Sequence, residues 1–338
     1  MAPVNPRRAI ETRRFALLCT TASGNARVLR QLLEGIAVRC DSAPFYDSSG
    51  ELIAHHSRRG GKVILYPFDA RCASSSPFDE ISHPADAQRI ACQLCSEAGS
   101  TDDNVWLETC RILMANMPRS LWSEVNASLK ALVDALQAKS KQTLKRWLGH
   151  TSSVRTFADD ADRATGGALF MLAKATNLIH FVRRERGRDA HPGAGDGGPL
   201  AFRDFIAGLN GREGPRPRVF VPRNEDCFEA AIPLMAGWLE CAASALSGFP
   251  PPPGRRIRFM FDELADLPRL DSLARLLPEE RKCRLAIVLT FQALGQMRNR
   301  YGSHIAEAML ACCNTSLFLQ ISTSRAANGL AKPLAIAR

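Results

Sequence analysis

Two adjacent acids, Asp262 and Glu263, follow the apolar segment Ile257–Phe261, an arrangement that suits a Mg²⁺-nucleotide site. The apolar run predicts a buried strand that delivers both carboxylates to its C-terminal end. The Asp can hold the metal ion through water, and the Glu can activate the water that attacks the phosphate. The alternative is a core strand followed by an acidic turn without chemistry, which the pair alone does not exclude.

A polar side chain, Gln292, follows the next apolar segment, Ala286–Thr290. In parallel α/β sheets, ligands lie outside the carboxyl ends of the strands. We therefore expect Gln292, Asp262 and Glu263 to point into one crevice. There Gln292 can contact the γ-phosphate of a nucleotide or orient water. Its alternative role is to cap the helix that follows.

A turn near the start of the chain is the candidate phosphate-binding loop, because it lies between a predicted strand and a predicted helix at Val28–Val38. Backbone N–H groups in such a turn can cradle phosphates. The residues assigned to this contact are Thr21, Ala22, Ser23, Gly24, Asn25, Ala26 and Arg27.

Only Gly24 in this turn fits the P-loop pattern G-x-x-x-x-G-K-[ST]. Cys19 replaces the first Gly, Asn25 the Lys, and Ala26 the Ser/Thr that holds Mg²⁺. Asn25 can donate a hydrogen bond but carries no charge, and losing one donor to a transition state typically costs about 10²–10³ in rate. We therefore expect negligible hydrolysis. Arg27 lies one residue late on the helix and is a poor substitute for the Lys.

Six short segments, in order, resemble the conjugative coupling proteins of type IV secretion systems, the TraD/TrwB family. The order and spacing agree over roughly residues 10 to 325. The segments are Phe45–Leu52 (family pattern YDxxGEF), Val63–Arg71 (NPxDxR), Val105–Leu113, Asp262–Leu270, Pro278–Lys282 and Phe291–Gly302.

The resemblance implies a RecA-like P-loop NTPase with an inserted all-α domain, using ATP and Mg²⁺. It also implies a homo- or hetero-hexameric motor that passes DNA, single strands included, to a secretion channel, with relaxase and channel subunits as partners. In this arrangement Asp262 holds Mg²⁺ through water, while Glu263 and Gln292 serve hydrolysis. Arg281 would reach the nucleotide of a neighbouring subunit, or is simply a surface Arg at a helix end.

Seven strand-like runs alternate with helix-like stretches, which predicts an α/β fold with a mostly parallel sheet. The residues between the third and fourth runs have little strand character and apolar spacings of three to four, which favours an all-helical insertion. We therefore divide the chain into a nucleotide-binding core at 1–82, an all-α domain at 83–188 and the second part of the core at 189–338, which stops short of the family's last strands. The runs are Phe15–Cys19, Ala43–Tyr46, Val63–Leu65, Val219–Val221, Ile257–Phe261, Ala286–Thr290 and Ser316–Gln320.

The formal charge of +10 and a pI near 9.3 favour an anionic partner such as DNA. No aromatic platform for stacking bases accompanies the basic stretches, so the expected contact is sequence-independent and salt-sensitive. The stretches are Arg7-Arg8, Arg13-Arg14, Arg58-Arg59, Lys139–Arg146 and Arg183–Arg188.

Eleven cysteines are scattered through the chain, and only Cys92 and Cys95 have the spacing of metal ligands. No second pair follows at zinc-site distance, so we interpret them as reduced structural thiols. We expect no apolar run to be long enough for a transmembrane helix. The expected location is the cytoplasm, with attachment to the inner membrane through partners.

Three functions remain open from the sequence. The first is a coupling-protein-like DNA motor that is weak or inactive as an ATPase. The second is a catalytically dead adaptor that binds relaxase or coupling-protein subunits, and the third is a HerA/FtsK-like DNA translocase. The segment Pro67–Arg71 argues against the third, because it resembles the conjugative branch. A fragment or a decaying gene copy fits the same features.

Overall fold

The computed structural model describes the chain in fifteen segments. They are residues 14–19, 24–38, 41–56, 62–69, 72–73, 75, 77–95, 104–123, 134–135, 139–158, 162–177, 200–209, 217–248, 257–283 and 285–319. The strands are β1 (Phe15–Cys19), β2 (Ala43–Asp47), β3 (Lys62–Ile64), β4 (Arg218–Pro222), β5 (Ile257–Phe261), β6 (Leu285–Phe291) and β7 (Thr315–Leu319). The α-helices are α1 (Asn25–Val38), α2 (Glu51–His56), α3 (Pro84–Leu94), α4 (Asn104–Ser123), α6 (Lys141–Trp147), α7 (Asp162–Asn177), α8 (Phe202–Gly208), α9 (Phe228–Gly248), α10 (Asp271–Cys283), α11 (Leu294–Tyr301) and α12 (Ser303–Cys312).

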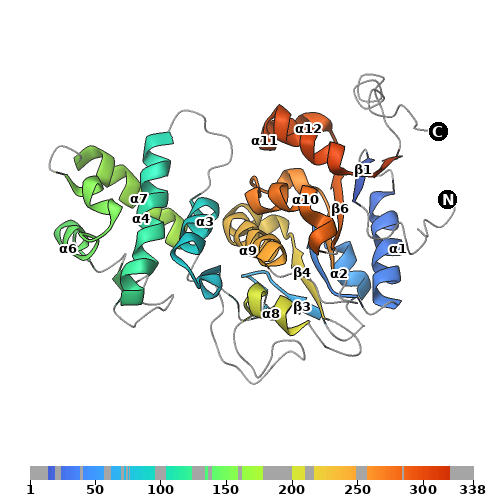
Figure 1. Cartoon of the computed structure of the whole chain (residues 1–338), viewed down its shortest axis with the longest axis horizontal. Helices are drawn as coiled ribbons and strands as arrows, with labels where there is room; N and C mark the ends of the chain where they lie inside the picture. The colour runs from blue at the N-terminus through green and yellow to red at the C-terminus, as the bar shows by residue number, and fades with distance from the viewer. Residues whose placement is uncertain are drawn as a thin grey trace.

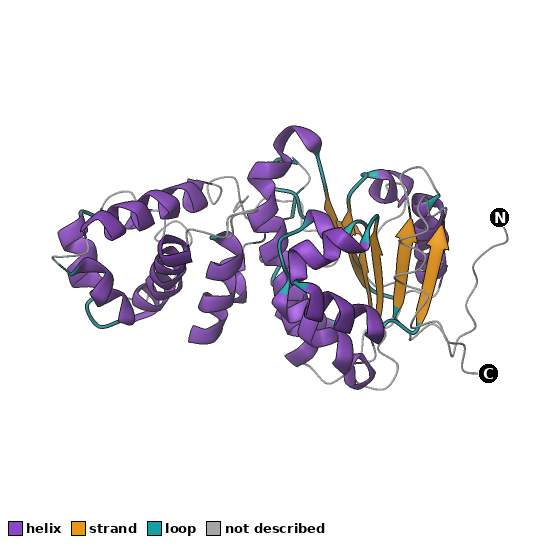
Figure 2. Cartoon of the chain, turned by 90° about the horizontal axis from the view of Figure 1, so that it is seen from above, coloured by secondary structure: helices purple, strands orange, loops and turns teal. Residues whose placement is uncertain are grey.

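The seven strands form one sheet in the order β3-β4-β2-β5-β6-β1-β7, and every pairing is parallel. Strands β1, β2, β4, β5 and β6 are buried along their whole length. Helices therefore cover both faces (Figure 2), as expected for strands that read as continuous apolar runs. All seven predicted strands are confirmed within one or two residues at their ends.

The two faces of the sheet carry separate cores. On β1, Leu17 packs into a smaller cluster with Val28 and Leu33 of α1. The neighbouring Leu18 points to the opposite face, into the larger cluster built around α9 and α10. This alternation follows from the two-residue repeat of a strand.

Helix α9 is central to the larger core (Figure 1). Together with the turn before it, Glu225–Gly248 is the one stretch of the described residues that is long and apolar enough to cross a membrane by length and composition. The expectation that no run reaches that length was therefore too strict. However, 72% of its apolar 18-residue window is buried inside the protein. Trp238 is also buried, and such burial is typical of a core helix.

Helices α4, α6 and α7 form a separate group away from the sheet (Figure 1). Within the described residues, no strand lies between β3 and β4, as the sequence predicts. Helix α3 joins the two groups, because it packs against both α4 and α9. The limits drawn at 83 and 188 stay predictions, and residues 178–199 lie outside the described part of the chain.

Candidate functional site

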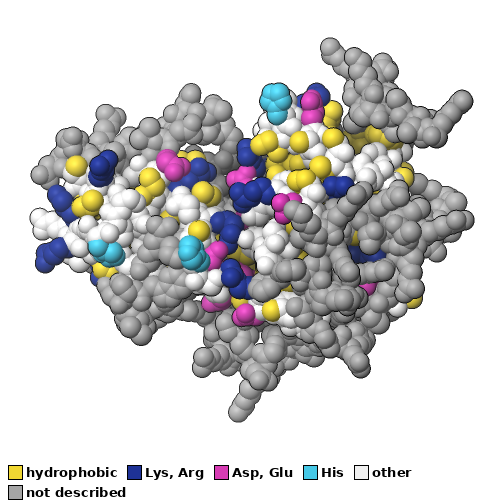
Figure 3. Space-filling view, in the orientation of Figure 1, with side chains coloured by type: hydrophobic (Ala, Val, Ile, Leu, Met, Phe, Trp, Pro, Cys, Tyr) yellow, Lys and Arg dark blue, Asp and Glu magenta, His cyan; other side chains and the backbone are white. Residues whose placement is uncertain are grey.

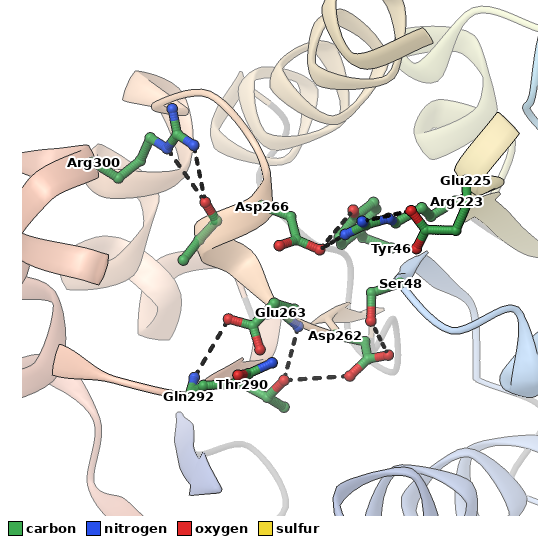
Figure 4. A network of polar contacts seen from close by, with 11 residues as sticks. Tyr46, Ser48, Arg223, Glu225, Asp262, Glu263, Asp266, Thr290, Gln292 and Arg300 are labelled. Carbon is green, nitrogen blue, oxygen red and sulfur yellow. Dashed lines mark hydrogen bonds and ion pairs between the residues drawn. The ribbon is translucent and has the colours of Figure 1, made fainter. Parts of the chain in front are cut away.

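The carboxyl ends of β5, β6 and β1 meet at one edge of the sheet, since these three strands are neighbours. The register pairs Phe261 of β5 with Leu289 of β6, which sets Asp262 beside Thr290. On the other side, Phe261 pairs with Tyr46 of β2. The acids that follow β5 are thus flanked by the ends of two strands (Figure 4).

The carboxylate of Asp262 is held by three uncharged donors. Asn25 Nδ2 donates to Oδ1 at 2.9 Å, and Ser48 Oγ donates to Oδ2 at 2.7 Å. Thr290 Oγ1 donates to Oδ1 at 3.4 Å. Burial raises the pKa of Asp262, and these hydrogen bonds oppose the rise. The predicted metal ligand is therefore already engaged on both oxygens.

Glu263 adopts a left-handed backbone, with φ 63° and ψ 70°, and no other described non-glycine residue has a positive φ. Such a conformation costs on the order of 1–3 kcal/mol and persists only where the surroundings enforce it. Here the N–H of Glu263 donates to Thr290 Oγ1 at 2.9 Å, and the N–H of Gln292 donates to Glu263 Oε1 at 3.4 Å.

Burial, with Asp266 nearby, raises the pKa of Glu263 to about 7. A carboxyl group that titrates near neutral pH is suited to accept a proton from water. The role of Glu263 in activating water stays a prediction.

Two arginines fix the turn that follows the acids (Figure 4). Arg300 of α11 donates from Nε and Nη2 to the carbonyl oxygen of Ala265, at 3.3 and 3.2 Å. Arg223, just after β4, forms a 2.6 Å ion pair with Asp266, which also accepts a 3.5 Å hydrogen bond from the Tyr46 hydroxyl. The backbone that carries Glu263 is thus held from two sides.

The candidate phosphate loop is described from Gly24 onward, and Thr21, Ala22 and Ser23 lie outside the described residues. Gly24 has φ 98°, a conformation that favours glycine, and its carbonyl oxygen accepts from the N–H groups of Arg27 and Val28. Helix α1 therefore begins at Asn25, three residues earlier than predicted. Ala26 is half-buried, and the Arg27 side chain is exposed.

Gln292 is brought to the acids as predicted, and its side chain is exposed at this edge. The N-cap position of α11 belongs to Ala293, whose N–H donates to Gln296 Oε1 at 3.0 Å. Arg281, by contrast, lies two residues before the C-terminal end of α10, and β6 begins shortly afterwards at Leu285. It is therefore at the amino edge of the sheet, opposite the acids, and its side chain lies outside the described set.

Two residues that donate hydrogen bonds to Asp262, Ser48 and Thr290, were not predicted from the sequence. Ser48 directly follows β2, so applying the strand-end rule to that strand would have found it. Thr290 is the last residue of the predicted run Ala286–Thr290, so the same rule points to it. Asp47, the last residue of β2, precedes Ser48 and is buried, and its Oδ2 accepts from the N–H of Ile53 at 2.8 Å. Burial raises the pKa of Asp47 to about 6.

Among the described residues, no group of three or more His, Cys, Asp or Glu is placed to hold a metal ion. A Mg²⁺ ion at Asp262 would depend on phosphate oxygens and water for its other ligands. Cys92 and Cys95, both described, belong to no such group of potential metal ligands. Among the basic stretches, the expectation that Arg14 contacts DNA is wrong. Arg14 is buried, and its side chain donates to the carbonyl oxygen of Leu277 at 2.6 Å.

A parallel sheet in this order, with a phosphate-loop position after β1 and paired acids after β5, defines a RecA-like P-loop NTPase fold. The chain belongs to the family described as "Type IV secretion-system coupling protein DNA-binding domain", whose match covers residues 1–335. The predictions of fold class and family are both confirmed.

Coupling protein TraD of Escherichia coli strain K12 is 26% identical over 310 residues, which is 92% of this chain and 42% of TraD. This chain thus spans less than half the length of that curated relative. The plasmid coupling protein TrwB in complex with ADP and Mg²⁺ matches with a TM-score of 0.77 at 24% identity, covering 91% of this chain and 71% of that chain. TrwB in complex with the non-hydrolysable ATP analogue ADPNP also gives 0.77, at 25% identity with the same coverage.

Proposed function

We propose that this chain is a DNA-binding subunit of a conjugative DNA-transfer motor whose nucleotide site hydrolyses ATP negligibly. One observation carries the proposal. The amide of Asn25, at the position of the P-loop Lys, is hydrogen-bonded at 2.9 Å to Asp262, at the position of the metal-binding acid. An uncharged donor thus occupies the carboxylate that a hydrolytic site would offer to Mg²⁺.

The charge balance at this edge supports the same conclusion. The positively charged side chain of Arg223 lies beside the acids. It already forms ion pairs with Asp266 at 2.6 Å and with Glu225 at 2.9 Å. A nucleotide would add further negative charge with no Lys to offset it. The carboxyl groups gathered here are Asp47, Asp262, Glu263 and Asp266.

TrwB binds ADP with Mg²⁺ and binds ADPNP, which supports the nucleotide as the ligand class. In this chain, backbone N–H groups at 22–27 would hold the phosphates and Asp262 would hold Mg²⁺ through water. Bound Mg²⁺ would neutralise phosphate charge. Glu263 would accept a proton from water, and Gln292 would contact the γ-phosphate. Ala26 offers the metal no hydroxyl, so the residues fit binding better than hydrolysis.

A basic surface on the helical group supports DNA as the partner. It consists of Lys139, Lys141, Lys145, Arg146 and Arg155, on and around α6 and the following short 3₁₀ helix Ser152–Phe157. Figure 3 shows Lys and Arg side chains at the end of the molecule that carries the helical group. Residues 134–158 contain one acid, Asp134. The Lys139 ammonium lies 4.8 Å from the Trp147 ring centroid, which holds one charge on this surface. Hexamer assembly, relaxase and channel partners, and action at the cytoplasmic face of the inner membrane are part of the proposal.

The second candidate is an adaptor that binds relaxase or coupling-protein subunits without nucleotide. The engaged Asp262 carboxylate favours it, because the site is closed by its own side chains. The two functions differ in one respect: assembly of the adaptor is unaffected by nucleotide. The family match leaves the HerA/FtsK-like translocase without support.

The test is calorimetric titration with Mg-ATP of the native chain and of the Asn25→Lys/Ala26→Thr variant. We expect micromolar binding and DNA-stimulated hydrolysis for the variant, and much weaker binding without hydrolysis for the native chain. Adding Asp262→Asn to the variant should abolish the hydrolysis and serves as the matched control. Hydrolysis by the native chain at the rate of the variant would overturn the proposal. No binding by either protein would favour the adaptor.

A further inference from the structure

Two thiols lie in contact inside the protein, one at the end of α3 and the other in α4. The thiol of Cys110 in α4 donates to Sγ of Cys95, at the end of α3, with 3.1 Å between the sulfur atoms. Both residues are buried, at 1% and 5% exposure. Cys95 is thus in contact with Cys110, whereas in the sequence it has the spacing of metal ligands with Cys92.

We infer that Cys95 and Cys110 form a disulfide bond when the chain meets a small-molecule disulfide such as oxidised glutathione. The sulfur atoms need to approach by about 1 Å to reach the bond length of about 2.05 Å. Cys95 is the C-cap of α3, with φ −98° and ψ 36°, so its backbone has already left the helical conformation. An adjustment there does not break the interior of α3.

The reaction balances as two thiol–disulfide exchanges. One protein thiolate attacks oxidised glutathione, forming a mixed disulfide and releasing one glutathione. The thiolate of the second cysteine then attacks the protein sulfur of the mixed disulfide and releases the second glutathione. The two protein thiols are oxidised, the glutathione disulfide is reduced, and the two thiol protons end on the released glutathione molecules.

The position of the pair sets both its rate and its consequence. The hydrogen bond with Cys110, together with burial, raises the pKa of Cys95, so oxidation is slow and requires local opening. Helix α3 packs against α9 of the larger core and against α4 of the helical group. A Cys95–Cys110 bond therefore ties α4 covalently to the helix that joins the two parts of the molecule.

Peptide mapping of the full chain, equilibrated in a glutathione redox buffer, tests the inference. We expect a Cys95–Cys110 crosslink in the native chain and in Cys92→Ser, and none in Cys95→Ser. Circular dichroism should show that the variants remain folded. Because the bond closes a loop of 15 residues, thermal unfolding should shift upward by several degrees and return to its starting value with dithiothreitol.

Three results would overturn the inference. The first is a Cys92–Cys95 crosslink in place of the expected one. The second is stable glutathione adducts on Cys95 or Cys110. The third is free thiols at both positions after equilibration in a buffer that oxidises the urea-unfolded chain. None of these outcomes depends on whether the chain binds nucleotide.

Discussion

The side-chain amide of Asn25 donates a 2.9 Å hydrogen bond to Asp262 across 237 residues of sequence. It fastens the first turn of α1 to the end of β5. Within the described residues, Asn25 Oδ1 has no hydrogen-bond partner, although this oxygen is buried. Asn25 stands where the P-loop pattern has its phosphate-binding Lys. Its hydrogen bond to Asp262 adds a structural contact to the nucleotide-free protein.

Replacing Asn25 by Ala is expected to lower the free energy of unfolding by about 1–2 kcal/mol, because a buried carboxylate loses a donor. Urea unfolding measures this loss. In a double-mutant cycle with Asp262→Asn, the two effects should be less than additive. Arg27→Ala, at an exposed position on the same helix, is the control and should change stability by less than about 0.5 kcal/mol. Additive effects at Asn25 and Asp262 would show that the contact carries no energy.

The left-handed backbone of Glu263 predicts that Gly is the better residue there for stability. Glu263→Gly and Glu263→Ala both remove the carboxyl group, but only Gly adopts φ 63° without strain. The Gly variant should therefore be more stable than the Ala variant by about 1 kcal/mol in urea unfolding. Equal stabilities would mean that the turn relaxes when the carboxyl group is lost.

The raised pKa of Glu263, about 7, predicts a pH dependence of stability. Between the ordinary pKa of 4.5 and about 7, the folded protein holds a proton that the unfolded chain releases. The free energy of unfolding therefore falls as pH rises through this window. Glu263→Gln should flatten the fall between pH 5 and pH 8 in urea unfolding. A residual slope should remain from Glu80, whose pKa burial raises to about 7, and from Asp47, whose pKa burial raises to about 6.

The basic surface around α6 predicts DNA binding that depends steeply on salt. Each phosphate contact contributes a slope of about −0.9 to log K against log salt on duplex DNA. Lys145→Gln/Arg146→Gln should therefore reduce the slope by about 2 in a fluorescence titration, with the same loss for unrelated DNA sequences. Arg30→Gln is the control, because Arg30 lies on α1 and pairs with Glu51. An unchanged slope in the double variant would place the DNA contact elsewhere.

The strands were readable from the sequence because each buried strand is a short apolar run, bounded by polar or turn residues. The run Ile257–Phe261 is buried throughout, and the acids at its end follow directly. The start of α1 was less readable, since it depends on Gly24 accepting the first helical hydrogen bonds. The expectation that no apolar run reaches transmembrane length missed Glu225–Gly248, whose apolar side chains pack in the core of the protein.

The sequence by itself determined the family, the parallel α/β fold, and the absence of the P-loop Lys and Ser/Thr at Asn25 and Ala26. Only the tertiary structure decided what Asn25 does instead, which side chains surround Asp262, and which thiol contacts Cys95. It also placed Arg281 at the opposite edge of the sheet from the acids. Local periodicity specifies strands and helices, whereas contacts between distant residues follow from strand order and register, which short-range patterns do not encode.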